Sequence, residues 1–235
     1  MPSVGLVIIG NEILTGKVHD QNTPFLARRL YELGAELRRV EVVSDEVEEV
    51  GRAVASASRA FDLVVTSGGV GPTHDDVTLA GVAHGLGTEL EALPELEALV
   101  RAYYKVERLT EVQARMTRVP AGSKLIYPRG RRFPQLVVGN VYIFPGVPEL
   151  LREKFEAVAD HFAGIPYHLE KLKLVAQEAD IALILEQAVE RFPDLRLGSY
   201  PYAEEEVWKV ELTLESRSRE EVLEALDFLT RALQG

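Results

Sequence analysis

The chain has 235 residues, of which 46 % are hydrophobic and 27 % charged, the composition of an ordinary globular protein. Its formal net charge of −11 argues against a nucleic-acid partner, and the lack of cysteine excludes disulfides and thiolate chemistry. No run reaches the roughly 18 apolar residues of a membrane span, so we expect no membrane association and a cytoplasmic location. The one basic cluster (Arg129, Arg131 and Arg132) is interpreted as a solvated loop.

The first 90 residues alternate between short apolar runs and helical patterns. This alternation predicts an α/β fold with a doubly wound, mostly parallel sheet. Asp45, with Glu48 three residues later, has the pattern of a capping box. The predicted strands cover 4–10, 35–43 and 61–67, and the predicted helices cover 23–34, 45–60 and 77–87.

The middle of the chain is more helical. Helices are predicted over 94–106, 111–119 and 147–162, and a strand over 123–127. Two apolar runs flank Gly139 and Asn140 within 135–146, which indicates a hairpin.

A domain boundary is predicted at residues 164–166, where the pattern changes. Residues 1–164 would form a nucleotide-binding domain, and residues 165–235 a small α+β domain of order β-α-β-β-α. The segment "WKVELTLES" (208–216) alternates strictly, so one face of its sheet is expected to be solvated or covered by a partner.

Three polar turns, 10–22, 66–76 and 145–149, follow predicted strands. Open parallel sheets bind ligands beyond the carboxyl ends of their strands, so these turns are expected to meet at one site. In the middle turn, Gly68, Gly69 and Gly71 would let backbone N–H groups approach an anion, although a plain tight turn is an equal alternative. The turn matches neither the Walker nor the Rossmann fingerprint.

Asp75 and Asp76 follow the glycines directly. One of them could simply cap the next helix, but two carboxylates beside a phosphate loop would repel the substrate unless a divalent cation lay between them. Glu12 is either a further member of that site or a solvated glutamate. Asn22 would cap a helix or donate its amide to a phosphate or ribose. Gly146 and Pro148 would be a helix entry or part of the phosphate site.

Taken together, "GNEILTGKVHDQNTPFLARRLYELG", "TSGGVGPTHDDVT" and "FPGVPELL" resemble the molybdopterin-binding-like (MoCF-biosynthesis) domain family, which includes the N-terminal domain of CinA proteins and a domain of FAD synthases. The resemblance implies a metal-dependent hydrolase of dinucleotide pyrophosphates and a homodimer. It implies Asp75, Asp76 and Glu12 as catalytic residues, with Asp75 and Asp76 holding Mg²⁺, Mn²⁺ or Co²⁺, accompanied by K⁺. The substrate-binding residues would be Asn22, Ser67, Gly68, Gly69, Gly71, Thr73, Gly146, Pro148 and Glu149.

The chain also departs from the family pattern. Asn11 stands where many relatives have aspartate, and "AQEADIA" (176–182) lacks the form common in CinA proteins, which favours the FAD synthase branch. No segment resembles the CinA deamidase or the domain that forms FAD, so neither activity is expected.

The predicted function is therefore hydrolysis of an ADP-containing dinucleotide, FAD or ADP-ribose, to AMP plus FMN or ribose 5-phosphate. Two alternatives use the same residues. One is a protein that binds or adenylylates molybdopterin, and the other is a nucleotide-binding module without catalysis.

Overall fold

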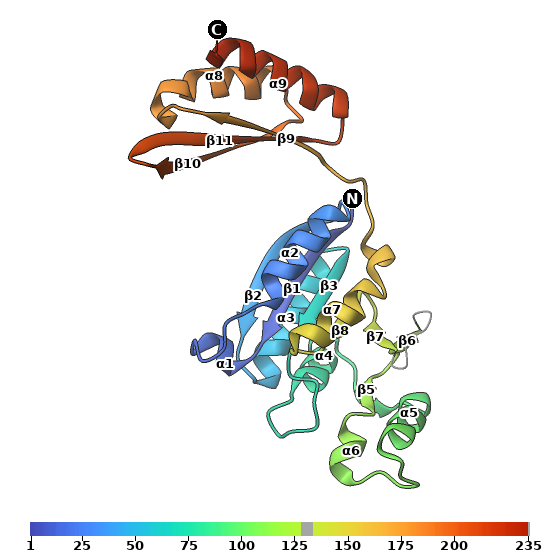
Figure 1. Cartoon of the computed structure of the whole chain (residues 1–235). Helices are drawn as coiled ribbons and strands as arrows, with labels where there is room; N and C mark the ends of the chain where they lie inside the picture. Colours follow the sequence, from blue (N-terminus) through green and yellow to red (C-terminus); the bar gives the residue numbers. More distant parts are fainter. Residues whose placement is uncertain (128–133, 235) are drawn as a thin grey trace. The chain divides into compact units, whose positions relative to one another are not determined.

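The computed structural model describes residues 1–127 and 134–234, and the chain divides into two compact units, Met1–Gly164 and Ile165–Gly235 (Figure 1). The predicted basic loop with Arg129, Arg131 and Arg132 lies outside the described residues. Among the described helices, none is long and apolar enough to cross a membrane.

The N-terminal unit is built on a six-stranded sheet of order β2-β1-β3-β8-β7-β6. β1 pairs in parallel with β2 and β3, and β3 pairs in parallel with β8, whereas β7 and β6 continue the sheet in antiparallel fashion. The predicted fold class and the predicted hairpin are confirmed. The strands are β1 (Ser3–Ile9), β2 (Glu36–Val43), β3 (Leu63–Ser67), β6 (Lys124–Ile126), β7 (Gln135–Val138) and β8 (Val141–Phe144).

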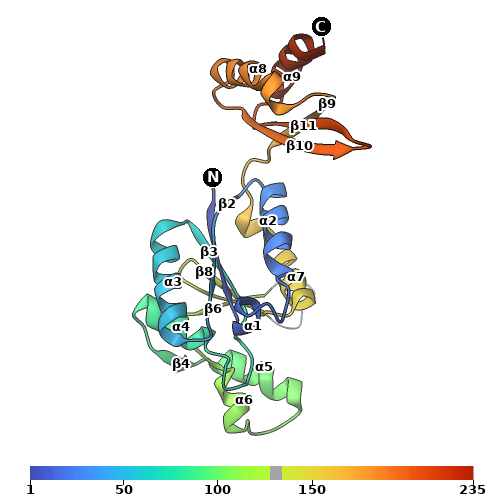
Figure 2. The same ribbon diagram turned by 90° about the vertical axis from the view of Figure 1, so that its left-hand side faces the viewer.

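Helices cover both faces of this sheet (Figure 2). α2 (Asn22–Glu32) and α7 (Pro148–Glu156) bury Leu26 and Phe155 against one face. α3 (Val47–Ala60) and α4 (Thr78–Leu86) bury Val54 and Val82 against the other. Because both faces are covered, the central strands are mostly apolar, as in other parallel sheets. A single short helix, α1 (Asn11–Leu14), follows β1 directly.

An excursion between α4 and the hairpin contains α5 (Pro94–Tyr104) and α6 (Glu111–Arg115). It also contains a two-stranded ladder of β4 (Leu90–Ala92) and β5 (Arg118–Pro120), which was not predicted. The predicted helix over 111–119 is therefore wrong in its second half. Residues before a proline disfavour helical geometry, and here they pair with β4 instead.

Two further predictions about helix ends are corrected. The capping box at Asp45 and Glu48 is absent, because Glu46 is the N-cap of α3 and the Asp45 carboxylate accepts the N–H of Asn11 at 2.7 Å. The helix predicted over 147–162 ends at Glu156, and a separate 3₁₀ turn, η1 (Ala159–Phe162), follows it.

The C-terminal unit is the predicted β-α-β-β-α layer, with an antiparallel sheet of order β10-β11-β9. Val210, Leu212 and Leu214 of β11 are buried beneath the two helices, as the alternating pattern predicts. The elements are β9 (His168–Leu174), α8 (Glu178–Arg191), β10 (Arg196–Glu204), β11 (Val207–Ser216) and α9 (Arg219–Gln234).

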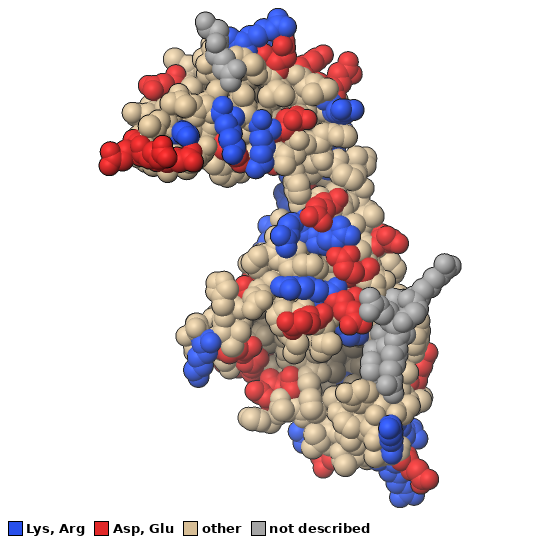
Figure 3. Space-filling model, viewed as in Figure 1, with Lys and Arg blue, Asp and Glu red and all other residues tan. Residues whose placement is uncertain are grey.

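The other face of this small sheet is polar. Glu211 accepts from the ammonium groups of Lys171 at 2.6 Å and Lys173 at 3.4 Å. Acidic side chains gather at the β10–β11 turn, where Glu204–Glu206 lie (Figure 3). Charge pairs thus share this face with exposed hydrophobic side chains such as Tyr200 and Leu169.

Candidate functional site

The carboxyl ends of three strands lie at one edge of the N-terminal sheet. β1 and β3 run in parallel with Ile8 opposite Ser67, and β3 and β8 run in parallel with Ser67 opposite Phe144. The three polar turns that follow these strands therefore begin next to one another. This is the arrangement in which open α/β sheets bind ligands.

Asn22 holds the three turns together. Its side-chain Nδ2 donates to Ser67 Oγ at 2.9 Å and to the carbonyl oxygen of Gly146 at 2.8 Å. The amide group is thus used inside the protein and does not cap α2. The Oδ1 atom of Asn22 is buried and has no hydrogen-bond partner among the described residues. A buried acceptor without a donor is costly, which makes this oxygen a place for a ligand hydroxyl or a water.

Asp20, and not Asn22, supplies the side-chain acceptor for the first N–H groups of α2. Its Oδ1 accepts the backbone N–H groups of Asn22 at 2.9 Å and Thr23 at 3.1 Å, the first donors of α2. This role of Asp20 was not predicted from the sequence. It could have been, because an aspartate just before a helical pattern is a preferred capping residue.

A small cavity of about 170 Å³, lined by both apolar and polar side chains, lies at this edge of the sheet. Glu12 and His19 line it together with Asn22, Ser67 and Gly146. Ligand pockets usually measure roughly 300–1,000 Å³, so this cavity has room for one part of a dinucleotide, such as a phosphate or a sugar.

Gly68 must be glycine for steric reasons. Its φ is +110°, and a Cβ atom at this position would lie 2.1 Å from the carbonyl oxygen of Ile9. The N–H of Gly68 donates to the carbonyl of Phe144 at 3.3 Å, so it is not available to an anion. Among the described residues, by contrast, no acceptor is bonded to the N–H groups of Gly69 and Gly71. The anion-binding part of the loop is therefore its second half.

Gly146 brings the "PGVP" turn against the glycine loop. A Cβ atom on Gly146 would lie 3.2 Å from Cα of Gly68, so the two backbones pass in close contact. Pro148 then opens α7, and Glu149 is exposed in the first turn of that helix. The N-terminus of α7 and the glycine loop thus lie side by side, and both are suited to negative charge.

The acid pair does not cap the following helix. Val77 is the N-cap of α4, and no side chain caps it. Asp76 instead closes its own loop, because its Oδ2 accepts the backbone N–H of Thr73 at 2.8 Å and also the Thr73 hydroxyl. The helix-cap alternative is therefore wrong for both aspartates.

Asp75 is largely exposed to solvent, with 63 % of its side chain accessible. The Thr73 hydroxyl, followed by the backbone N–H of Asp75 itself, holds the pKa of the Asp75 carboxyl below its usual value. The hydrogen bond of the Thr73 hydroxyl goes to Asp76, so the carboxylate of Asp75 lies beside this hydroxyl and remains exposed to solvent.

The structure does not gather all predicted acids at one point. Glu12 lines the small cavity with its carboxylate over Gly10, whereas Asp75 and Asp76 do not line that cavity. Within residues 1–127 and 134–234, no three acidic or histidine side chains form a metal-binding cluster. Of the two histidines near the rim, His19 lines the cavity, while His74 is exposed beside Asp75.

Comparison with known proteins defines the class. The family described as "Probable molybdopterin binding domain" matches residues 5–164, and "FAD synthase, middle domain" matches residues 166–235. The crystal structure of the protein CinA, of unknown function, from Thermoplasma acidophilum covers 68 % of this chain and 98 % of its own, with a TM-score of 0.63 and 33 % identity.

The chain therefore belongs to the molybdopterin binding domain family, in the form that carries a FAD synthase middle domain. A "Probable FAD synthase" of Caenorhabditis briggsae is 33 % identical over 93 % of this chain. A protein of Archaeoglobus fulgidus is 32 % identical over 83 % of this chain and 84 % of its own length. The chain spans about half the length of the Caenorhabditis relatives, 47 % and 50 %.

Proposed function

We propose that this protein is a metal-dependent nucleotide pyrophosphatase. It would hydrolyse an ADP-containing dinucleotide, FAD or ADP-ribose, to AMP plus FMN or ribose 5-phosphate. The observation that carries the proposal is an acid pair with no helix-capping role, next to loop N–H groups that have no partner among the described residues. The two relatives named as probable FAD synthases favour FAD as the first substrate to test.

The pyrophosphate would be held by two groups of donors. The N–H groups of Gly69 and Gly71 would bind one phosphate, and the adjacent N-terminus of α7, beginning at Pro148 and Glu149, would bind the other. Ser67 and Gly146 stand between them, fixed by Asn22. The unpartnered Oδ1 of Asn22 would accept a hydroxyl of the attached ribose.

The carboxylates of Asp75 and Asp76 fit a Mg²⁺-type ion. Such an ion takes only one or two protein carboxylates and completes its shell with water and substrate phosphates, so a three-residue cluster is not required. Asp75 is free in solvent, and Asp76 keeps its Oδ1 available, since only Oδ2 is bonded to Thr73. When bound, with or without K⁺ nearby, the ion would neutralise charge on the phosphates and increase the acidity of water.

In the reaction, a water oxygen forms a bond to one phosphorus while the bond from that phosphorus to the bridging oxygen breaks. The second phosphate ester leaves with the bridging oxygen. Glu12 or Asp75 would orient the water and accept its proton. The position of Glu12 at the wall of the small cavity and the exposure of Asp75 support either assignment.

The test is a product assay by chromatography. The protein is incubated with FAD, ADP-ribose, NAD and diadenosine compounds, each with Mg²⁺, Mn²⁺ or Co²⁺ and with a chelator control. We expect AMP and the second phosphate ester with metal and neither with chelator. AMP that forms equally well with chelator, or no product with any metal, would contradict the proposal.

A second candidate follows from the match of residues 5–164 to a probable molybdopterin binding domain. Pterin that copurifies with the protein, combined with no dinucleotide cleavage, would favour a molybdopterin-binding or adenylylating role. Nucleotide binding without turnover would favour the module without catalysis.

We also propose a cytoplasmic homodimer, which rests on the family resemblance. Light scattering on the purified protein tests the subunit number, and a monomer at micromolar concentration would contradict it.

A further inference from the structure

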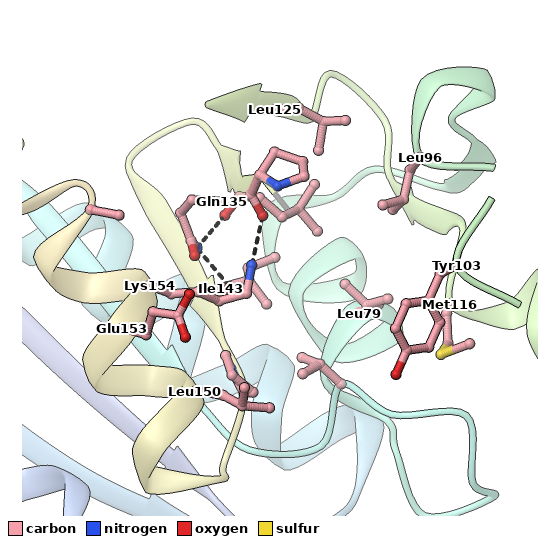
Figure 4. Close-up of a pocket in the computed structure, with 15 residues that line it drawn as sticks. Leu79, Leu96, Tyr103, Met116, Leu125, Gln135, Ile143, Leu150, Glu153 and Lys154 are labelled. Carbon is pink, nitrogen blue, oxygen red and sulfur yellow. Dashed lines mark hydrogen bonds between the residues drawn. The ribbon is translucent and has the colours of Figure 1, made fainter. Parts of the chain in front are cut away.

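The N-terminal unit has a second and larger cavity, of about 470 Å³, beside the glycine loop. Leu150 and Lys154 of α7 and Gln135 of β7 lie on one side of it, and Tyr103 and Met116 of the excursion lie on the other (Figure 4). Val70 of the glycine loop and Pro145 of the "PGVP" turn also line it, so the cavity adjoins the proposed phosphate site. Its volume lies within the roughly 300–1,000 Å³ of small-molecule sites.

Most of the cavity wall is apolar. Leu79, Leu96 and Leu125 line it from three different elements. A phosphate or a sugar placed here would lose its hydration without gaining partners. A flat ring with apolar faces would lose little, and the ring of Tyr103 and the thioether of Met116 are suitable surfaces for it.

Gln135 is buried in one wall of the cavity and is held rigidly. The side chain is buried, and its Nε2 donates to the carbonyl oxygens of Leu136 at 2.9 Å and Ile143 at 2.7 Å. These two bonds fix the orientation of the amide and leave Oε1 without a partner among the described residues. The hairpin thus holds a buried acceptor in place with no donor of its own.

Lys154 supplies donors at the same side. Its Nζ donates to the carbonyl oxygen of Pro134 at 2.7 Å, and the carboxylate of Glu153, which also lines the cavity, attracts its charge. An ammonium group has three N–H donors, so two remain for a ligand. Burial lowers the pKa of Lys154, which shows that the apolar surroundings act on the charged group.

We propose that this cavity binds the flat heterocyclic ring of the dinucleotide, with Lys154 donating to a ring acceptor and the apolar wall covering the faces of the ring. The proposal rests on the proposed function for the identity of the ligand. Adenine carries ring nitrogen acceptors, and isoalloxazine carries carbonyl acceptors. Both rings therefore offer an acceptor to Lys154.

The test uses rings without phosphate, so that it is independent of hydrolysis. Riboflavin is titrated by fluorescence and adenosine by calorimetry, against the wild type, Leu150→Trp and Lys154→Met. Leu150 is half exposed, so a larger side chain fills the cavity mouth without disturbing the core. Leu183→Trp, at an exposed position of α8, is the matched control.

We expect one of the two rings to bind the wild type and the control, and both cavity variants to weaken that binding at least tenfold. The KM for the dinucleotide should rise by a similar factor in the variants, with kcat changed less than twofold. Hydrolysis by the wild type without binding of either ring, and with an unchanged KM in the variants, would overturn the ring site and leave the pyrophosphatase intact. Ring binding that is lost in the variants, without hydrolysis by the wild type, would support the ring site and overturn the pyrophosphatase.

Discussion

The two units of the chain use their polar groups differently. In the C-terminal unit, Glu211 is paired with Lys171 and Lys173 on the open face of the sheet. In the N-terminal unit, Asn22 and Gln135 each bury an acceptor oxygen that has no partner among the described residues. Both oxygens belong to residues that line cavities. An unpartnered buried oxygen at a cavity wall marks a place for a water or a ligand, whereas Thr66 and Arg217 have such atoms away from the cavities.

The largest effect is expected at the acid pair. Asp76→Asn removes one charge, while an asparagine oxygen still accepts from Thr73, so the fold should persist. Because charge stabilisation by a metal is worth several kcal/mol, turnover of the dinucleotide should fall roughly 100-fold or more. The measurements are kcat/KM and the calorimetric unfolding transition. Asp160→Asn, at an exposed aspartate of η1, is the control, and near-normal activity of Asp76→Asn would remove the metal-site assignment.

The next effect concerns the glycine loop. Gly68→Ala places a Cβ against the Ile9 carbonyl in a backbone with φ of +110°, so the free energy of unfolding should fall by roughly 2–4 kcal/mol. Gly122→Ala is the matched control, because Gly122 also has positive φ but has no atom within 4 Å of the added Cβ. It should cost only about 1–2 kcal/mol. Equal losses in the two variants would show that contact with β1 is not the cause.

A smaller effect is expected from the pH dependence of Lys154. Burial lowers its folded-state pKa below the ordinary value of 10.5, so the unfolded chain binds more protons between those two pKa values. The wild type should therefore gain stability relative to Lys154→Met as the pH rises through that range, and show no relative change well below it. Calorimetric midpoints of both proteins from pH 7 upward test this. A loss of stability of the wild type relative to Lys154→Met as the pH rises would contradict this prediction.

The smallest effect is expected in the C-terminal unit. Lys171, with Lys173, lowers the pKa of the Glu211 carboxyl, so its stabilising contribution is present above the ordinary pKa of 4.5 and is lost as pH falls through the lowered value. Exposed ion pairs contribute little, so Glu211→Gln should shift unfolding only slightly at neutral pH and not at low pH. The fluorescence of Trp208, the single tryptophan, reports on this unit. A change in dinucleotide turnover in Glu211→Gln would contradict the separate roles assigned to the two units.

Much of the fold was predictable because periodicity is a local signal. The strand at 4–10, the helix at 77–87 and the alternation in 208–216 were each predicted close to their observed bounds. The ladder of β4 and β5 was missed because strands of three residues have no detectable period. The predicted helix cap at Asp45 was wrong, because the Asp45 carboxylate accepts the N–H of Asn11, a backbone group distant in sequence.

The adjacency of the three polar turns was predictable, but their hydrogen bonds were not. Parallel strands bring residues 10–22, 66–76 and 145–149 to one edge, and this follows from the strand order alone. That Asn22 bonds Ser67 and Gly146, or that Asp76 bonds Thr73, depends on side-chain geometry that no spacing specifies. The apolar cavity was not predicted, because its walls come from positions between Val70 and Ala157 that share no motif.

The most direct test of the central claim is hydrolysis in water enriched in ¹⁸O. The protein is incubated with FAD or ADP-ribose and a divalent metal, and the two products are analysed by mass spectrometry. We predict one ¹⁸O atom in the phosphate of one product, because water attacks one phosphorus and the bridging oxygen leaves with the other phosphorus. AMP formed without ¹⁸O in either product, or no AMP with any metal, would contradict it.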